Sequence, residues 1–150
     1  MSANEKLATT GKFEADVSGQ DYFKAECISL RSFPSPYDEL ALEGWDNNGR
    51  GLIITIYNYE NVVPGHAYKI YPDQGDHDVS VDVQFATDDS VRWETLAGGT
   101  LTVNKMDLPN AHVEVSFGFS AEGDGNVAKF VGGANLTGFS LSRRASTVLK

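Results

Sequence analysis

The chain is poor in the residues that build cross-linked and metal-bound scaffolds. Cys27 is the only cysteine among 150 residues, which excludes an intrachain disulfide and a cysteine-rich metal site. Its place in the apolar run around Ile28 predicts a buried, inert thiol. His66, His77 and His112 fall in three separate segments, and no pair has the helical spacing of a zinc motif. A zinc site would therefore need distant parts of the chain to converge.

Positive charge and long apolar runs are also scarce. Twelve Lys and Arg stand against 21 Asp and Glu, which gives a net charge of -9, and such a surface repels nucleic-acid phosphates. No stretch approaches the roughly 18 apolar residues that span a bilayer, and the N-terminus lacks the apolar core of a signal peptide. We therefore expect no nucleic-acid partner and no membrane span. The expected location is the cytoplasm, or the exterior by export without a classical leader, unless a leader has been removed.

The residues that are abundant favour sheet. Eight Phe, six Tyr and two Trp accompany many Val and Thr. Val79, Val81, Val83 and Phe85 alternate with polar residues, which is the period of a half-buried strand. Similar patterns, broken by turn-forming residues, predict further strands over 12–18, 22–30, 67–71, 91–95, 100–105, 112–121, 126–131 and 134–142.

The close spacing of these strands indicates antiparallel pairing. We predict one domain over residues 1–150, an all-β antiparallel sandwich of about ten strands, with partial closure toward a barrel as the variant form. Residues 1–10 read as a polar arm and 143–150 as a basic-ended tail.

The stretch 35–44 is compatible with two structures. Residues 35–38 fit the start of a short helix, with a Ser cap, a Pro and an acid three residues on. Apolar residues also alternate over 39–46, and Asn47-Asn48-Gly49 predicts a tight turn. We favour a hairpin of 39–46 with 51–59, and the short helix stays as the alternative.

Several short sequence patterns follow one another along the chain. They are a strand that ends in Gly, a strand of the form apolar-x-apolar-x-Gly, an Ile-rich strand, a Pro-Gly turn, a Gly-Thr-apolar repeat, a Phe-rich strand and a closing Gly-Phe pair. They occupy Phe13 to Gly19, Leu40 to Trp45, Leu52 to Tyr57, Pro64 to Tyr68, Gly99 to Val103, Val113 to Ala121, and Gly138-Phe139.

This order resembles a group of small all-β bacterial proteins of unknown function, many of them Bacteroidetes lipoproteins. The resemblance spans about residues 12–142. It implies a β-sandwich and a non-enzymatic role, and it implies no site residue. Because this chain has no lipid-acceptor cysteine behind a signal peptide, membrane anchoring is not carried over.

An acidic loop is the one candidate metal site. Asp73, Asp76 and Asp78 surround Gly75 and His77, and closely spaced Asp with Gly is how flexible loops supply the oxygens that calcium needs. Their spacing departs from the EF-hand pattern. The alternative interpretation is a solvated loop, so Ca²⁺ is an optional cofactor and no other cofactor is expected.

Tyrosines near predicted turns form the candidate binding surface. Tyr57, Tyr59, Tyr68 and Tyr71 carry it, and Tyr22 has a similar placement. A tyrosine offers an apolar ring and a hydroxyl, which suits sugar stacking or protein contacts. The alternative is that most of these rings pack in the core.

Catalytic signals are weak. Glu43 and Glu94 each lie near a tryptophan, Trp45 and Trp93, and a carboxyl beside an aromatic wall can have the raised pKa that glycosidases use. The alternative is that Glu and Trp in a strand face opposite ways or pair across a sheet. We therefore predict a non-enzymatic protein that binds a protein partner or itself, with the polar arm adding a strand to a neighbour's sheet edge. The alternatives are a calcium-assisted carbohydrate-binding module, a small barrel for an apolar ligand, and a leaderless toxin or effector.

Overall fold

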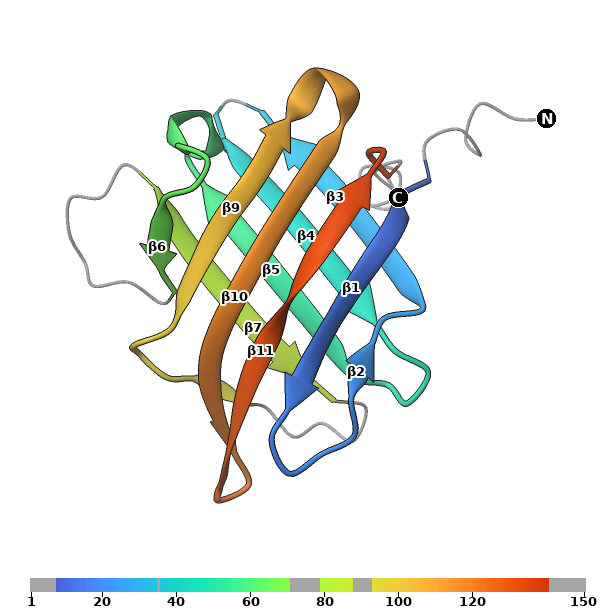
Figure 1. The fold of residues 1–150 in the computed structure, drawn as a ribbon, viewed down its shortest axis with the longest axis vertical. Helices are drawn as coiled ribbons and strands as arrows, with labels where there is room; N and C mark the ends of the chain where they lie inside the picture. Colours follow the sequence, from blue (N-terminus) through green and yellow to red (C-terminus); the bar gives the residue numbers. More distant parts are fainter. Residues whose placement is uncertain (1–7, 35, 71–78, 88–92, 141–150) are drawn as a thin grey trace.

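The computed structural model describes residues 8–34, 36–70, 79–87 and 93–140, which form two antiparallel sheets packed face to face (Figure 1). Sheet A consists of β1 (Thr10–Val17), β2 (Phe23–Lys24), β6 (Ala67–Lys69), β8 (Glu94–Thr95), β9 (Thr100–Asp107), β10 (His112–Gly123) and β11 (Asn126–Thr137). Sheet B consists of β3 (Cys27–Phe33), β4 (Glu39–Trp45), β5 (Gly51–Tyr57) and β7 (Ser80–Ala86). The fold is an all-β sandwich and not a closed barrel.

The order of the strands brings distant parts of the chain together. Sheet A runs β2-β1-β11-β10-β9-β6, with β8 beside β10, and sheet B runs β3-β4-β5-β7. The first strand therefore pairs with the last, so that Thr10 lies opposite Thr137 and Val17 opposite Phe130. Among the described residues, two single-turn 3-10 helices connect strands, η2 (Tyr59–Asn61) and η3 (Leu108–Asn110). In the part of the chain described, no helix is long and apolar enough to cross a membrane.

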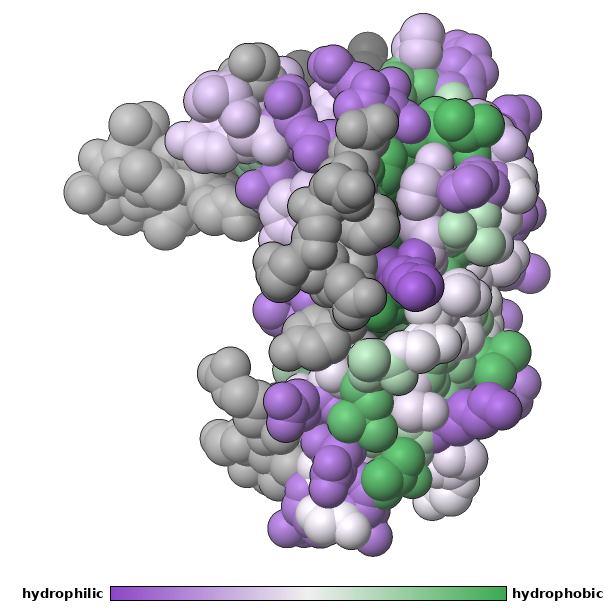
Figure 2. Space-filling view, turned by 90° about the vertical axis from the view of Figure 1, so that its left-hand side faces the viewer, coloured by the Kyte–Doolittle hydropathy of each residue, from purple (hydrophilic) through white to green (hydrophobic). Residues whose placement is uncertain are grey.

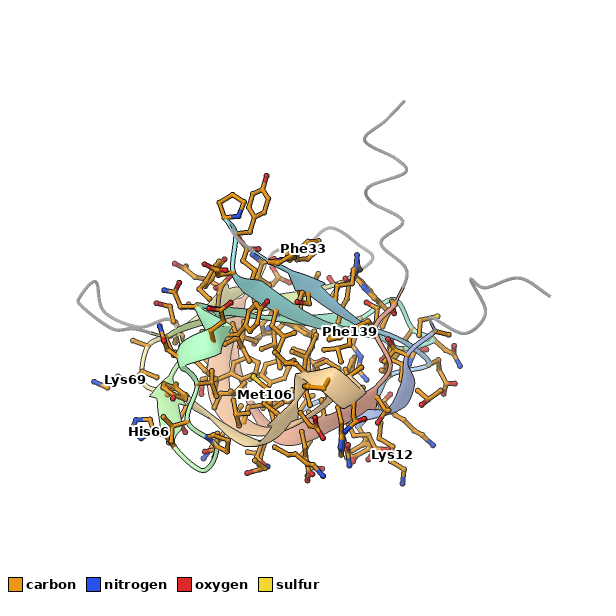
Figure 3. The ribbon with its side chains drawn as sticks, turned by 90° about the horizontal axis from the view of Figure 1, so that it is seen from above. Lys12, Phe33, His66, Lys69, Met106 and Phe139 are labelled. Atoms are coloured by element: carbon orange, nitrogen blue, oxygen red, sulfur yellow. The ribbon has the colours of Figure 1, made fainter. Side chains whose placement is uncertain are left out.

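A row of aromatic rings joins the two sheets. Phe85 of sheet B lies 4.8 Å from Phe130 of sheet A between ring centroids, and Phe130 stacks on Phe119 at 4.6 Å with an interplanar angle of 2°. The row continues through Phe117 and Phe13 to Phe23 of β2. Figure 3 looks between the layers: Phe139 lies between them, and Lys12 extends outward from sheet A.

The expected alternation of β7 is confirmed. Val81, Val83 and Phe85 are at most 2% exposed, whereas Gln84 on the opposite face is exposed. The favoured hairpin is confirmed as well, with β4 and β5 paired from Glu39–Tyr57 to Trp45–Gly51. The short helix is therefore not formed over the described part of 35–44.

Three expectations need correction. Residues 22–30 are not one strand, because the chain turns between β2 and β3. Residues 126–137 form one strand, since Gly132-Gly133 continues the ladder and does not break it. Cys27 is exposed, because it shares the outer face of β3 with Ser29 and Arg31, whereas Leu30 points into the core.

Each edge strand of sheet B forms hydrogen bonds with a segment outside the sheet. At β3, Leu30 accepts a hydrogen bond at its carbonyl from the Ser140 N–H at 2.8 Å, and its own N–H donates to Thr9 Oγ1 at 3.0 Å. At β7, the Thr95 hydroxyl donates to the Val83 carbonyl at 2.6 Å. Figure 2 shows the edge of the sandwich at β6 and β7, where apolar spots lie scattered among polar ones. An added strand at sheet B would have to displace these contacts.

The β4–β5 turn contains a buried ion pair. Asp46 Oδ2 accepts a hydrogen bond from Arg50 Nε at 2.8 Å, and Asp46 Oδ1 accepts the N–H groups of Asn48 and Arg50, each at 2.9 Å. Burial alone would raise the pKa of the Asp46 carboxyl. The hydrogen bonds from Arg50 and Asn48 and the charge of Arg50 outweigh burial, and the pKa lies below its ordinary value.

We expect Asp46 to make folding stability sensitive to acid. A carboxyl whose pKa is lower in the folded state stabilises the fold fully above its unfolded-state pKa, near 4, and this stabilisation is lost as pH falls through the folded-state pKa. Urea unfolding between pH 7 and pH 2.5 should show a steeper loss for the wild type than for Asp46→Asn. Glu60→Gln, at an exposed carboxyl of η2, is the matched control and should keep the wild-type slope. An unchanged slope in Asp46→Asn would contradict the assignment.

Candidate ligand-binding groove

A groove opens on the outer face of sheet A, away from the core. The strand register places outward-facing residues of β1, β11 and β10 side by side, in three successive rows across the strands. The middle row is Glu14, Gly133 and Ser116. Because Gly133 has no side chain, the surface dips between its neighbours, and the resulting groove has a volume of about 480 Å³. The residues around the dip are Lys12, Glu14, Asp16, Tyr22, Glu114, Ser116, Val131 and Asn135.

Tyr22 forms the aromatic wall of the groove. It is 52% exposed, and its hydroxyl donates to Glu14 Oε1 at 3.0 Å. This hydrogen bond raises the pKa of the Tyr22 hydroxyl, and burial and the charges of Glu14 and Asp16 act in the same direction. The phenol is protonated at neutral pH and donates to Glu14, and its half-exposed ring is available for contact.

The other walls supply polar groups of several kinds. The row above Gly133 holds Lys12, Asn135 and Glu114 in adjacent strands. The Asn135 side-chain oxygen lies 2.7 Å from Nε2 of His112, and Asn104 donates to the Ser116 hydroxyl oxygen at 2.8 Å. These bonds hold the side chains in place. The groove thus combines an aromatic ring, ammonium and amide donors, and carboxylate acceptors on a rigid sheet.

A buried arginine from the other sheet holds the base of the aromatic wall. Arg50 is 8% exposed. Its Nη1 donates to the Asp21 carbonyl and its Nη2 to the Tyr22 carbonyl, each at 2.9 Å. Nη1 also lies 3.3 Å from the Gln20 side-chain oxygen, and the guanidinium lies 5.8 Å from the centroid of the Phe23 ring. The two terminal nitrogens of Arg50 therefore join the β4–β5 turn to residues 20–22, while Nε bonds to Asp46 within the turn.

The described tyrosines of the predicted binding surface, Tyr57, Tyr59 and Tyr68, have different surroundings. Tyr59 is buried at 6% exposure, because η2 turns its ring into the core, where its hydroxyl accepts from Ser32. Tyr57 lies at the end of β5 in sheet B and is 36% exposed, with its pKa raised by burial and then by the charge of Asp82. Tyr68 lies in β6 of sheet A, and its hydroxyl accepts from the Val63 N–H at 2.8 Å. Tyr71 lies outside the described residues.

The predicted calcium ligands Asp73, Asp76 and Asp78 also lie outside the described residues. Within the described ranges, no three His, Cys, Asp or Glu side chains come close enough to hold a metal ion. His66 packs beside Tyr68 in sheet A, with 4.7 Å between ring centroids.

The two glutamates considered for hydrolysis lie on different sheets. Glu43 of sheet B accepts from Trp45 Nε1 at 2.6 Å and pairs with Arg31 at 2.9 Å. Glu94 lies in β8 opposite Glu122 of β10. The structure therefore does not bring Glu43 and Glu94 together, and the Trp45 indole serves as a donor to a neighbouring carboxylate.

A second cleft, of about 490 Å³, opens at the end of the sandwich. Its lining includes Gln20, Trp93 and Asn126. It borders Thr87 and Trp93, which flank a segment outside the described residues. The groove on sheet A is the better-defined candidate, because none of its lining residues adjoins a segment outside the described residues.

Tyr22 is expected near a turn from its sequence, but its contact with Glu14 is not. The connecting signal is the turn at Gly19, which folds β2 back onto β1 and sets Lys24 opposite Glu14. No protein-family model, curated protein or solved structure matches this chain. The residues of the groove are therefore the basis for the proposed function.

Proposed function

We propose that this protein is a non-enzymatic β-sandwich that binds a saccharide in the groove on sheet A. The observation that carries the proposal is the half-exposed ring of Tyr22 beside carboxylate and amide groups over the dip at Gly133. A pyranose presents an apolar face to an aromatic ring and hydroxyls to polar groups, and the groove offers partners for both.

The rigidity of the groove favours binding at low entropic cost. Glu14 and Val131 lie on strands paired along their length, and the Tyr22 hydroxyl is already bonded to Glu14. A ligand therefore need not order these groups when it binds. A face of this kind also suits the proposed binding role better than strand addition at sheet B, where existing contacts occupy the edges.

We expect Tyr22→Ala to weaken saccharide binding by about tenfold, since a stacked aromatic contributes about 0.5–1.5 kcal/mol beyond its buried area. Calorimetry and NMR titration with cellohexaose, mannohexaose and chitohexaose would measure the affinity. Tyr37→Ala is the matched control, because Tyr37 is 67% exposed but does not line the groove. It should bind like the wild type.

A filled groove provides a second test that leaves Tyr22 in place. Ser116 is exposed at the centre of the groove, and Ser116→Tyr would occupy the space above Gly133. Loss of binding in Ser116→Tyr and Tyr22→Ala, with binding kept in Tyr37→Ala, supports the proposal. No binding of any hexasaccharide by the wild type, or equal binding by all variants, would rule out a saccharide site here.

A further inference from the structure

Arg50 lies immediately before β5 of sheet B, but its side chain contacts the segment that carries Tyr22, the aromatic wall of the groove. It follows the β4–β5 turn, which lies next to the chain between β1 and β2 in the fold (Figure 1). The groove's own residues do not include it. The guanidinium of Arg50 is buried, and its two terminal nitrogens donate to main-chain oxygens of the segment that carries Tyr22.

Arg50 contacts two consecutive peptide groups, one on each side of the Tyr22 Cα. Nη1 and Nη2 donate to the carbonyls of Asp21 and Tyr22. Two consecutive carbonyls held by one planar fork fix the position of the Tyr22 Cα, which a single bond would leave free to rotate. Asp46 in turn fixes the guanidinium through Nε. The alignment of the ring is therefore set from the opposite sheet.

The far end of Tyr22 is held by a different group. Its hydroxyl donates to Glu14 on β1, so the side chain spans from the Arg50 fork to the groove floor. We expect a displacement of the backbone end to lengthen or break the hydrogen bond between the Tyr22 hydroxyl and Glu14. The Tyr22–Glu14 bond is therefore a reporter for the alignment of the backbone.

We propose that Arg50 is a positioning residue for the groove, and that it holds Tyr22 in its binding orientation through the carbonyl oxygens of Asp21 and Tyr22. The effect on ligand affinity rests on the saccharide function proposed above. The alignment of Tyr22 itself does not, and it can be measured without ligand.

The test compares Arg50→Lys and Arg50→Met with the wild type, using protein labelled with ¹³C in its tyrosine rings. Lysine keeps the charge but cannot reach both carbonyls as a planar fork, and methionine keeps much of the apolar stem without charge. NMR titration of the phenols gives the pKa of Tyr22, with the signal of Tyr37 as the internal reference. We expect the pKa of Tyr22 to fall toward its ordinary value in both variants, because the bond to Glu14 is loosened.

Ligand affinity provides the functional readout. With cellohexaose, mannohexaose and chitohexaose as probes, we expect affinity to fall about fivefold in Arg50→Lys, the cost of re-ordering a freed side chain. Ile54→Val is the matched control, since Ile54 is fully buried in β5. It weakens packing without touching residues 20–22, and should leave both the Tyr22 pKa and the affinity unchanged.

The outcomes separate the two proposals. If no hexasaccharide binds the wild type but the Tyr22 pKa falls in the Arg50 variants, positioning holds and the saccharide function fails. If both readouts stay at wild-type values in folded Arg50 variants, or change equally in Ile54→Val, Arg50 has only a general structural role.

If neither Arg50 variant folds, Asp46→Asn is the deciding variant. It removes the charged partner of Nε and should lower the pKa of Tyr22 as the Arg50 variants would. An unshifted Tyr22 in Asp46→Asn would then overturn the proposal.

Discussion

Replacing Phe130 by alanine is expected to lower the free energy of unfolding by about 3–5 kcal/mol. Phe130 is fully buried in β11. Its ring stacks on Phe119 in its own sheet and meets Phe85 of the other sheet. Removing the Phe130 ring interrupts the aromatic row where the two sheets meet. The cavity left behind cannot close, because the strands around it are held in place by their hydrogen bonds.

Urea unfolding followed by circular dichroism would measure this loss. Small domains have a free energy of unfolding of about 5–15 kcal/mol, so Phe130→Ala should remain folded in water but unfold at a much lower urea concentration, with its slope unchanged. Val127→Ala on the same strand is the control. Val127 is 60% exposed, and its loss should change stability by less than about 0.5 kcal/mol. A loss below about 1 kcal/mol in Phe130→Ala would mean that the sheets do not depend on this contact.

Local patterns were enough to predict the elements that depend on neighbouring residues. The alternation from Val79 to Phe85 fixes which side of β7 faces the core, because the two faces of a strand differ only in their side chains. The Asn47-Asn48-Gly49 turn predicts the β4–β5 hairpin in the same way, and Gly49 does adopt a positive φ of 84°. In both cases the deciding interactions lie within a few residues of one another.

Contacts between distant segments were not predictable. No local signal in Lys12 to Asp16 indicates that β1 pairs with β11, because any strand with an alternating pattern could fill that place. The groove depends on this pairing, since its middle row takes one residue from each of three strands. The same holds for Arg50: a basic residue after a turn reads as exposed, and its burial requires the carbonyls of Asp21 and Tyr22 to arrive from elsewhere in the chain.

Glycine was the residue most easily misread. Gly132 and Gly133 break the alternation of side chains, and a pattern-based interpretation divides the strand there. In the fold, the ladder passes through both residues without interruption. A glycine in a strand can mark the close approach of another backbone as well as an end, and sequence alone does not distinguish the two.

This close approach leads to the second large effect, which is expected for Gly132→Ala. A Cβ at Gly132 would overlap the Glu14 carbonyl oxygen at 2.0 Å and the Ala15 Cα at 2.6 Å. These are main-chain atoms of β1 and cannot rotate away, so β1 must move off β11. We expect a loss of about 3 kcal/mol or more, at the upper end of what overpacking costs. Because the same approach holds Glu14 beside Gly133, the groove should open and the Tyr22 wall should shift with β1.

Gly118→Ala is the matched substitution, made on the neighbouring strand. A Cβ there would have no heavy atom nearer than 3.9 Å, so alanine fits without strain. The change should stabilise the fold by about 0.4–1 kcal/mol, because alanine has less freedom than glycine in the unfolded chain. Paired urea melts would therefore shift in opposite directions for two replacements that each add one methyl group to sheet A. Shifts of the same sign and size would show that the glycine at 132 does not serve the contact between β1 and β11, and the explanation of the groove floor would fail with it.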